Sequence, residues 1–500
     1  MCRLGLLMLV MVGGGFGYVV NLDHETMNGH NGFKVYDKKN EPVGSSVAGL
    51  GDINDDGYTD FAISETFFQR GSPPARVYIF FGQGGKSFPK SINVNRGAWL
   101  DGTTGMTIVA PNDDFDHIAG VRPVGDMNGD GVDDFAVDTP EGYDRDDPSG
   151  VYVVFGSRHL PAMIEDLRNY VNGTNGFFAP VKKSGYTLGY RSVYHAGDFN
   201  GDGMDDMILG CDCGENYIIY GSRRPFNTTV DVYALDGENG VLLFNSKHPS
   251  YVRGIPNAVA GGVDFNGDGV DDIFVGNYYT GVVSVLYGGN TERPSPVDLG
   301  ILNGYDGTTF TMNCRQYFCM GYALGALEDF NGDGFGDLVI GTRSVGDEQT
   351  GGEVFLVMGA PTNHYPATAN IYDLLDGVNA TSLVAPFDWD HDSGLGDTVA
   401  TAGDFNNDGY TDAFMAKYNY GAPWMHSPDL LYLVFGGPTL LTPNYTITDI
   451  ASSSHGIQFK SNDKHTHAMA SQPADVNNDG VDDIIFGYPT TYVFYGPYKP

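Results

Sequence analysis

A nine-residue pattern, D-x-N-x-D-G-x-x-D, occurs seven times in this chain of 500 residues. Successive copies are 65 to 75 residues apart, and together they span nearly the whole chain. A period of that length predicts a repeat architecture, in which each unit is one supersecondary element that packs on its neighbours. The copies begin at Asp52, Asp126, Asp198, Asp264, Asp329, Asp404 and Asp475.

Short apolar segments recur in a fixed order within each unit, and this order predicts β-strands. In the first unit, segments at 46–50 and 61–63 flank the acidic loop, a third at 77–81 ends at Gly82, and a fourth begins at 92–94. Four short antiparallel strands are typical of one propeller blade, so the chain is predicted to be an all-β, seven-bladed β-propeller. Later third strands are expected at 151–155, 282–287, 354–358 and 431–435, and fourth strands at 230–235, 297–302 and 371–375.

The two ends of the chain complement each other. The chain stops just after an expected third strand at 492–495, so the seventh unit lacks a fourth strand. The N-terminal region has a spare apolar segment at 18–22, followed by N-G-H-N-G-F at 28–33. We therefore expect the N-terminal strand to complete the last blade and close the ring, which removes an exposed sheet edge. The alternative is an open solenoid with a disordered N-terminus.

The first 17 residues predict a secretory signal peptide. Arg3 precedes an apolar run at 4–12, and a small-x-small cleavage site follows at 15–17. The run is too short to span a bilayer, and no later segment is long and apolar enough to do so. The expected domains are therefore the signal peptide at 1–17 and a secreted propeller at 18–500.

Charge and cysteine content agree with an exported protein. The formal net charge of -36 argues against binding to nucleic acid or to anionic membranes. Four N-x-S/T sequons predict a glycoprotein. Cys314 and Cys319 suit a local disulfide, whereas Cys211 and Cys213 would form a tighter one. The sequons lie at Asn172, Asn227, Asn379 and Asn444.

The repeated acidic pattern predicts a cation site in every blade. A tight loop can place side-chain oxygens from positions 1, 3, 5 and 9 around one point, with a backbone carbonyl from position 7. Hard oxygen ligands in a flexible loop favour calcium, so we expect up to seven Ca2+ ions. Without a cation, carboxylates about 4 Å apart would repel by about 4 kcal/mol per pair at an effective dielectric near 20. The candidate ligands are Asp52, Asn54, Asp56, Tyr58, Asp60; Asp126, Asn128, Asp130, Val132, Asp134; Asp198, Asn200, Asp202, Met204, Asp206; Asp264, Asn266, Asp268, Val270, Asp272; Asp329, Asn331, Asp333, Phe335, Asp337; Asp404, Asn406, Asp408, Tyr410, Asp412; and Asp475, Asn477, Asp479, Val481 and Asp483.

An EF-hand would open with the same nine letters but needs Glu at position 12 and helices on both sides. Here position 12 is apolar in every copy and belongs to the strand that follows. The pattern therefore excludes EF-hands and the related dockerin loops. The residues at position 12 are Ile63, Val137, Leu209, Val275, Ile340, Met415 and Phe486.

The segment G-D-F-N-G-D-G-M-D-D-M-I-L-G at 197–210 and the V-Y-V-V-F-G segment ending at Gly156 resemble FG-GAP repeats, the units of the integrin alpha-subunit N-terminal propeller. The resemblance covers about 18–500. It implies that the acidic loops join first and second strands and bind calcium on one face, while the opposite face binds partners. Integrin leg domains and a membrane span are not recognised here, so we expect a free-standing propeller. Similar repeats occur in a glycosylphosphatidylinositol-specific phospholipase, behind a separate catalytic domain, and in a fungal lectin.

These features favour an extracellular, calcium-stabilised adhesion or ligand-binding module whose partner is a protein or a glycan. A lectin is the alternative, and a subunit of an extracellular filament is a further one. An enzyme is not expected, because the histidines have no nucleophile motif around them. Aromatic loop residues either mark recognition or pack onto the barrel. The histidines considered are His117, His195, His391 and His465, and the aromatic loop residues are Phe67, Phe68, Tyr278, Tyr279, Phe387, Trp389, Tyr418, Tyr420 and Trp424, with Asn419 between the last tyrosines.

Overall fold

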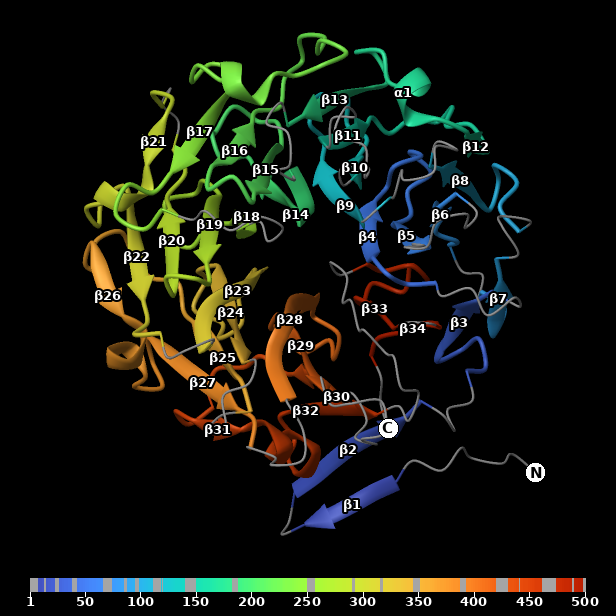
Figure 1. The fold of residues 1–500 in the computed structure, drawn as a ribbon. Helices are drawn as coiled ribbons and strands as arrows, with labels where there is room; N and C mark the ends of the chain where they lie inside the picture. The colour runs from blue at the N-terminus through green and yellow to red at the C-terminus, as the bar shows by residue number, and fades with distance from the viewer. Residues whose placement is uncertain are drawn as a thin grey trace, which may run out of the picture.

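Seven β-sheets stand side by side around a central axis in the computed structural model, and the predicted seven-bladed propeller is confirmed (Figure 1). The predicted third strands at 77–81, 151–155, 282–287, 354–358, 431–435 and 492–495 are confirmed to within a residue or two at each end. The structure describes residues 8–12, 15–22, 27–37, 43–65, 74–84, 88–94, 99–110, 118, 120–139, 150–181, 188–249, 257–289, 293–314, 318–344, 351–386, 393–419, 430–439, 441–460, 474–487 and 490–497.

Each complete blade has four antiparallel strands in chain order. Blade one comprises β4 (Val47–Gly51), β5 (Asp60–Glu65), β6 (Arg76–Phe80) and β8 (Gly105–Val109); blade two β9 (Gly120–Gly125), β10 (Asp134–Thr139), β11 (Gly150–Val154) and β13 (Gly176–Pro180); and blade three β14 (Leu188–Gly197), β15 (Asp206–Cys211), β16 (Asn216–Ile219) and β17 (Gly240–Phe244). Blade four comprises β18 (Ala258–Val263), β19 (Asp272–Asn277), β20 (Val282–Leu286) and β22 (Gly307–Thr311); blade five β23 (Phe318–Leu327), β24 (Asp337–Ser344), β25 (Glu353–Val357) and β27 (Ala380–Val384); and blade six β28 (Ser393–Gly403), β29 (Asp412–Asn419), β30 (Leu430–Val434) and β32 (Gly456–Lys460).

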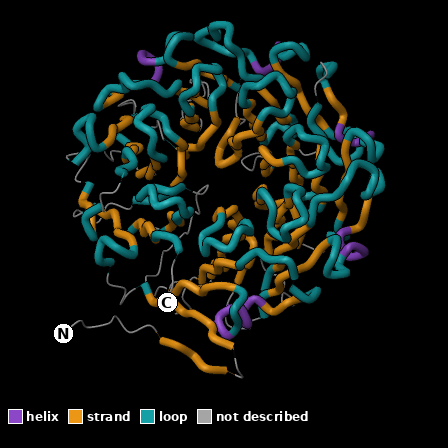
Figure 2. Tube along the Cα trace, turned by 180° about the vertical axis from the view of Figure 1, so that it is seen from behind, coloured by secondary structure: helices purple, strands orange, loops and turns teal. Residues whose placement is uncertain are grey.

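The predicted fourth strands were wrong, because those segments belong to the edge of the preceding blade. There they form a short fifth strand parallel to its fourth strand, and most then turn into a short helix on the outer rim (Figure 2). The fifth strands are β7 (Ser91–Asn93), β12 (Met163–Ile164), β21 (Val297–Asp298), β26 (Thr368–Asn370) and β31 (Tyr445–Thr446), with an isolated bridge from Phe178 to Thr229 in blade two. The helices are α1 (Leu167–Tyr170), η2 (Val232–Ala234), η3 (Leu299–Ile301), η4 (Ile371–Leu374) and η5 (Ile447–Ser452).

Two local signals explain this arrangement. A capping Asp or Asn starts four of the five helices, because its side chain accepts the backbone N–H two residues later, as Asp298 does with Gly300 (2.8 Å). In η5 the cap is Thr446, without a side-chain hydrogen bond. A second Asx turn then precedes the true fourth strand. In blade five, Asp376 accepts the N–H of Val378 (2.8 Å) and of Asn379 (2.7 Å) just before β27.

The N-terminal region closes the ring, as predicted, but with a later strand. β3 (Gly32–Tyr36) is the fourth strand of blade seven, antiparallel to β34 (Thr491–Phe494), which pairs in turn with β33 (Ile484–Phe486). The predicted segment 18–22 instead lies largely in β2 (Gly15–Asn21), the parallel fifth strand of blade six. β1 (Met8–Val12) pairs with the outer edge of β2. The first strand of blade seven is described only at a bridge between Ala474 and Asp483.

The hydrophobic core lies between blades. One cluster joins Phe33 of blade seven to Phe61 and Phe80 of blade one, and all three side chains are fully buried. The rings of Phe61 and Phe80 stack at 4.9 Å. Because each blade supplies only part of such a cluster, a single blade cannot bury its own faces.

The structure places the cysteines and three of the sequon asparagines where an exported protein would have them, in disulfides and on the surface. Both cysteine pairs are disulfide-bonded, Cys211 to Cys213 and Cys314 to Cys319. Of the sequon asparagines, Asn379 is half-buried and donates to Asp376, whereas the other three are exposed. Across the described residues, no helix combines the length and apolarity that a bilayer crossing requires.

Candidate metal centres

The seven acidic loops occupy equivalent positions in the propeller. Each joins the first strand of a blade to the second, so all seven lie on one face, which we call the acidic face. The 2–3 hairpins and the connections from fourth strands to the next first strands lie on the other face, the opposite face. The acidic residues are thus arranged as a ring around the central axis.

Side chain–backbone hydrogen bonds fold every loop in the same way. In the first loop, Oδ1 of Asp52 accepts the N–H of Asp56 (3.0 Å) and Oδ2 accepts that of Gly57 (2.7 Å). Oδ1 of Asp56 then accepts the N–H of Tyr58 (3.0 Å). The same three bonds recur in the other six loops. Gly57 has a φ of +88°, a conformation that favours glycine at position 6.

The ninth-position Asp has a structural role that the sequence pattern does not reveal. In blade five, Oδ1 of Asp337 accepts the N–H of Gly359 (2.8 Å) and Oδ2 accepts that of Phe330 (2.7 Å). Asp337 is fully buried, so it ties the start of its loop to the end of the third strand. In every other blade the ninth-position Asp also accepts from the glycine after the third strand, at 2.7 to 2.9 Å.

The glycine that follows each third strand is a steric requirement of this contact. A Cβ on Gly359 would lie 2.2 Å from the carbonyl oxygen of Gly336, the eighth residue of the same loop. Equivalent carbonyl oxygens lie 2.1 to 2.5 Å from the Cβ positions of the other six glycines. A glycine therefore follows each apolar third strand because the end of that strand lies very close to the acidic loop.

Neighbouring loops are bonded to each other around the acidic face. Oδ2 of Asp133, at position 8 of the second loop, accepts the N–H of Asp52 in the first loop (2.8 Å). Asp205, Asp271 and Asp482 make the same bond to the preceding blade. The D-D doublet at positions 8 and 9 is visible in the sequence, but only the ring geometry explains its first member.

Burial raises the pKa of the ninth-position carboxyls, and the acidic groups at positions 1 and 5 raise it further. The pKa of Asp337 rises to about 8, and in the other six loops the pKa of the equivalent Asp rises well above its usual range. A nearby cation would reverse this effect, because it favours the ionised form.

The donor chemistry of the loops fits a hard cation. Oδ1 of Asn54 and Oδ1 of Asn406, both at position 3, are buried oxygens without a hydrogen-bond partner, and so is Oδ2 of Asp412 at position 9. Among the described residues, no three Asp, Glu, His or Cys side chains stand close enough together to hold a metal ion as they are. Backbone amides compensate part of the carboxylate charge instead. In each loop, positions 1, 3, 5 and 9 and the position-7 carbonyl would hold Ca2+.

Of the four histidines considered as catalytic candidates, only His195 lies in the described residues, and its Nε2 is 2.9 Å from Oδ1 of Asp205. Of the aromatic loop residues, Tyr278 and Tyr279 are described in full, and the Tyr279 side chain is 47% exposed at the tip of the β19–β20 hairpin. Tyr418 and Asn419 end β29. The residues outside the described part are Phe67, Phe68, His117, Phe387, Trp389, His391, Tyr420, Trp424 and His465.

Comparison with known families agrees with the loops and strands described above. The FG-GAP repeat model matches 256–286 and 320–357, which contain acidic loops and third strands of blades four and five. These two segments of the chain are FG-GAP repeats. The chain is 28% identical over 253 residues to Integrin alpha pat-2 of Caenorhabditis elegans, a match that covers 47% of this chain and 18% of the integrin.

Other similarities of this chain cover less of its length or show lower identity. It is 32% identical over 169 residues to Phosphatidylinositol-glycan-specific phospholipase D of Rattus norvegicus, covering 30% of this chain and 18% of the phospholipase. It thus spans less than a fifth of the length of either relative. The match to the solved BP39L lectin from Burkholderia pseudomallei covers 89% of this chain and 95% of the lectin, at 14% identity and a TM-score of 0.39.

Substitutions at positions 5 and 9 of one loop should separate metal binding from loop architecture. We expect Asp337→Ala to lower the unfolding free energy by about 3 kcal/mol with or without calcium, because the substitution leaves two buried backbone N–H groups without an acceptor. Asp333→Ala, at the exposed position 5, should lower it only when calcium is present. Thermal melts of both variants in calcium and in EGTA test this. A calcium-independent loss for Asp333→Ala would assign that side chain to the framework as well.

Proposed function

We propose that this protein is a secreted, calcium-binding FG-GAP propeller that acts as an extracellular adhesion or ligand-binding module. On its acidic face, Asp133, Asp205, Asp271 and Asp482 each bond the loop of one blade to the loop of the preceding blade. The single observation that carries the proposal is this set of bonds between loops, because it gives the acidic face a structural role and leaves the opposite face for recognition. The similarity to integrin alpha subunits supports an adhesive role.

The opposite face carries a preformed aromatic cluster. The ring centroid of Tyr278 is 4.4 Å from that of Tyr279 and 5.4 Å from that of Tyr322 in the neighbouring blade, so the hairpin is braced. Tyr279 stays exposed at its tip. A rigid, exposed tyrosine offers contact area at a small entropic cost, as interface tyrosines do.

A lectin is the second candidate, because an amide-lined cavity without acidic side chains opens between blades three and four on the opposite face. We propose no catalytic activity. His195 pairs with Asp205 beside the acidic loops, which is a structural contact.

Cell attachment to surfaces coated with the full secreted chain tests the proposal. We expect attachment in calcium at about 2 mM, which exceeds the dissociation constants of about 10⁻⁴ to 10⁻³ M of extracellular calcium modules, and its loss in EGTA. Tyr279→Ser should weaken attachment several-fold, because it removes the exposed ring on the opposite face. Tyr305→Ser is the matched control, since Tyr305 is 71% exposed in the turn before β22, away from that face. Attachment that depends on Tyr305 and not on Tyr279 would contradict the assignment of the recognition face, and no attachment would contradict adhesion.

A further inference from the structure

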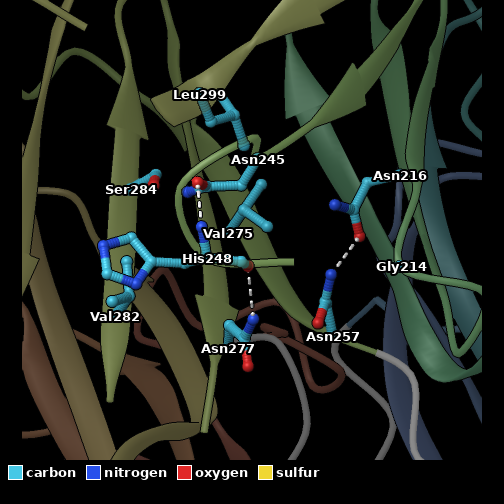
Figure 3. A pocket seen from close by; sticks show the side chains of 10 residues that line it. All are labelled: Gly214, Asn216, Asn245, His248, Asn257, Val275, Asn277, Val282, Ser284 and Leu299. Atoms are coloured by element: carbon cyan, nitrogen blue, oxygen red, sulfur yellow. Dashed lines mark hydrogen bonds between the residues drawn. The ribbon is translucent and has the colours of Figure 1, made fainter. Parts of the chain in front are cut away.

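A small cavity lies between blades three and four on the opposite face (Figure 3). Its walls come from separate segments of the chain: the first residue of β16, the connection from β17 to β18, and both ends of the β19–β20 hairpin. Its volume is about 10 Å3, which is room for about one water-sized group. The lining residues are Gly214, Asn216, Asn245, His248, Asn257, Val275, Asn277, Val282, Ser284 and Leu299.

His248 is the only titratable side chain in the lining of this cavity, although the protein as a whole carries a net charge of -36. No carboxylate, ammonium or guanidinium group is among the lining residues. A divalent cation would need anionic oxygens, and a charged ligand would need an opposite charge. The cavity therefore suits a neutral, polar group.

Two asparagine side chains in the cavity wall have hydrogen-bonding groups that no described residue uses. Nδ2 of Asn257 donates to Oδ1 of Asn216 (3.2 Å), which leaves the Asn216 amino group and the Asn257 amide oxygen without a partner among the described residues. Asn216 is 2% exposed and Asn257 is 7% exposed, so both amides are more than nine-tenths buried. Figure 3 shows the Asn216–Asn257 pair on one wall of the cavity. Neither group belongs to the fully buried polar atoms that lack a partner, so both keep some accessible surface. A hydroxyl can accept from an amino group and donate to an amide oxygen at once.

The opposite wall is fixed before any ligand arrives. Nδ2 of Asn277 donates to the carbonyl oxygen of His248 (3.0 Å), and Asn277 pairs with Val282 across the hairpin. The hairpin that forms this wall also carries the exposed Tyr279. An amide-lined recess on a hairpin that also carries an exposed aromatic ring offers the two contacts that a sugar makes, hydrogen bonds to hydroxyls and packing of an apolar ring face.

We propose that this cavity is a subsite for one hydroxyl-bearing corner of an uncharged carbohydrate. The inference rests on the proposed function, since it names the ligand class of the same recognition face. The ligand hydroxyl would accept from the Asn216 amino group and donate to the Asn257 amide oxygen. Because the cavity is small, it has room for one hydroxyl group and not for a whole sugar ring.

An array of immobilised uncharged and sialylated oligosaccharides, probed with the full chain in millimolar calcium, tests the proposal. We expect retention on uncharged glycans, and binding weaker by about tenfold or more for Asn216→Ala, which removes the donor. Ser284→Val should have the same effect, because it fills the cavity from another wall while Asn216 and Asn257 stay in place. Asn169→Ala, an exposed asparagine in α1, is the matched control and should bind like the parent.

The outcomes separate this inference from the proposed function. Retention that neither cavity variant weakens, even if their melting temperature falls, would mean that the cavity holds a structural water only, and the subsite would be refuted. Retention by sialylated glycans alone would refute the uncharged ligand class. If no glycan is retained while cell attachment persists, the subsite is refuted and the adhesive function stands; loss of both would refute the adhesive function too.

Discussion

Chelation with EGTA at pH 7.5 is expected to lower the melting temperature of the full chain by about 10 °C. Extracellular calcium modules bind with dissociation constants of about 10⁻⁴ to 10⁻³ M. At 1 mM calcium and about 10⁻⁴ M affinity, each site would add about 1.4 kcal/mol to the unfolding free energy, so seven sites would add about 10 kcal/mol. Unfolding entropies scale with length, and for a chain of this size about 1 kcal/mol corresponds to about 1 °C.

The effect of chelation should grow with pH. The pKa of Asp337 is raised to about 8 in the folded, metal-free protein, whereas an unfolded Asp ionises near 3.9. Between these values the folded state holds a proton that the unfolded state has lost, so the stability of the metal-free protein falls as pH rises. Bound calcium keeps the carboxylate ionised and removes that loss. The difference in melting temperature between calcium and EGTA should therefore be smaller at pH 5 than at pH 8.

Differential scanning calorimetry in calcium, in EGTA and in EGTA with excess magnesium measures these effects. Magnesium is the matched control, because it demands near-ideal octahedral geometry and dehydrates reluctantly, so it should restore little of the melting temperature. A melt that EGTA leaves unchanged at pH 8 would remove calcium from the stability of this fold. A calcium effect that shrinks with rising pH would contradict the protonation argument.

The sequence predicts the acidic loops and the third strands well, because both signals are local. The loop pattern fixes residues within nine positions, and the third strands are continuous apolar runs that end at a glycine such as Gly359, whose backbone approaches the loop. The dual role of Asp337 could not be predicted from that pattern. Its hydrogen bond to Gly359 depends on a contact between the acidic loop and the end of the third strand, which only the folded blade brings together.

The fourth strands were misplaced for a related reason. Segment 297–302 is apolar and short, like a strand, yet Asp298 caps a helical turn and β21 pairs in parallel with the preceding blade. A parallel edge pairing leaves no turn signal in the sequence, whereas the Asx-Gly turn before the true fourth strand does. The cavity between blades three and four could not be predicted either, because its amides are brought together only by the packing of two blades.

Removal of residues 18–36 is expected to open the ring and leave a chain that aggregates instead of melting cooperatively. The deletion takes away β3, whose Phe33 and Val35 are fully buried between blades seven and one. Burial of each such side chain contributes about 2 to 3 kcal/mol. The deletion also exposes the edge of β34, which pairs with β3 from Gly32 to Val35 in the parent. An unpaired strand edge promotes association with other chains.

Deletions of different length test whether instability comes from opening the ring at β3 or from shortening the N-terminal region in general. A chain beginning at Tyr18 should be as stable as the parent, because the pairing of β2 with β32 starts at Tyr18 and all of β3 is retained. Phe33→Ala should lower the unfolding free energy by about 4 kcal/mol, whereas His30→Ala, in the exposed turn before β3, should not. Size-exclusion chromatography and thermal melts report both outcomes. A deletion of 18–36 that stays monomeric and melts like the parent would show that β3 does not close the ring, since no other described strand pairs with the β3 side of β34.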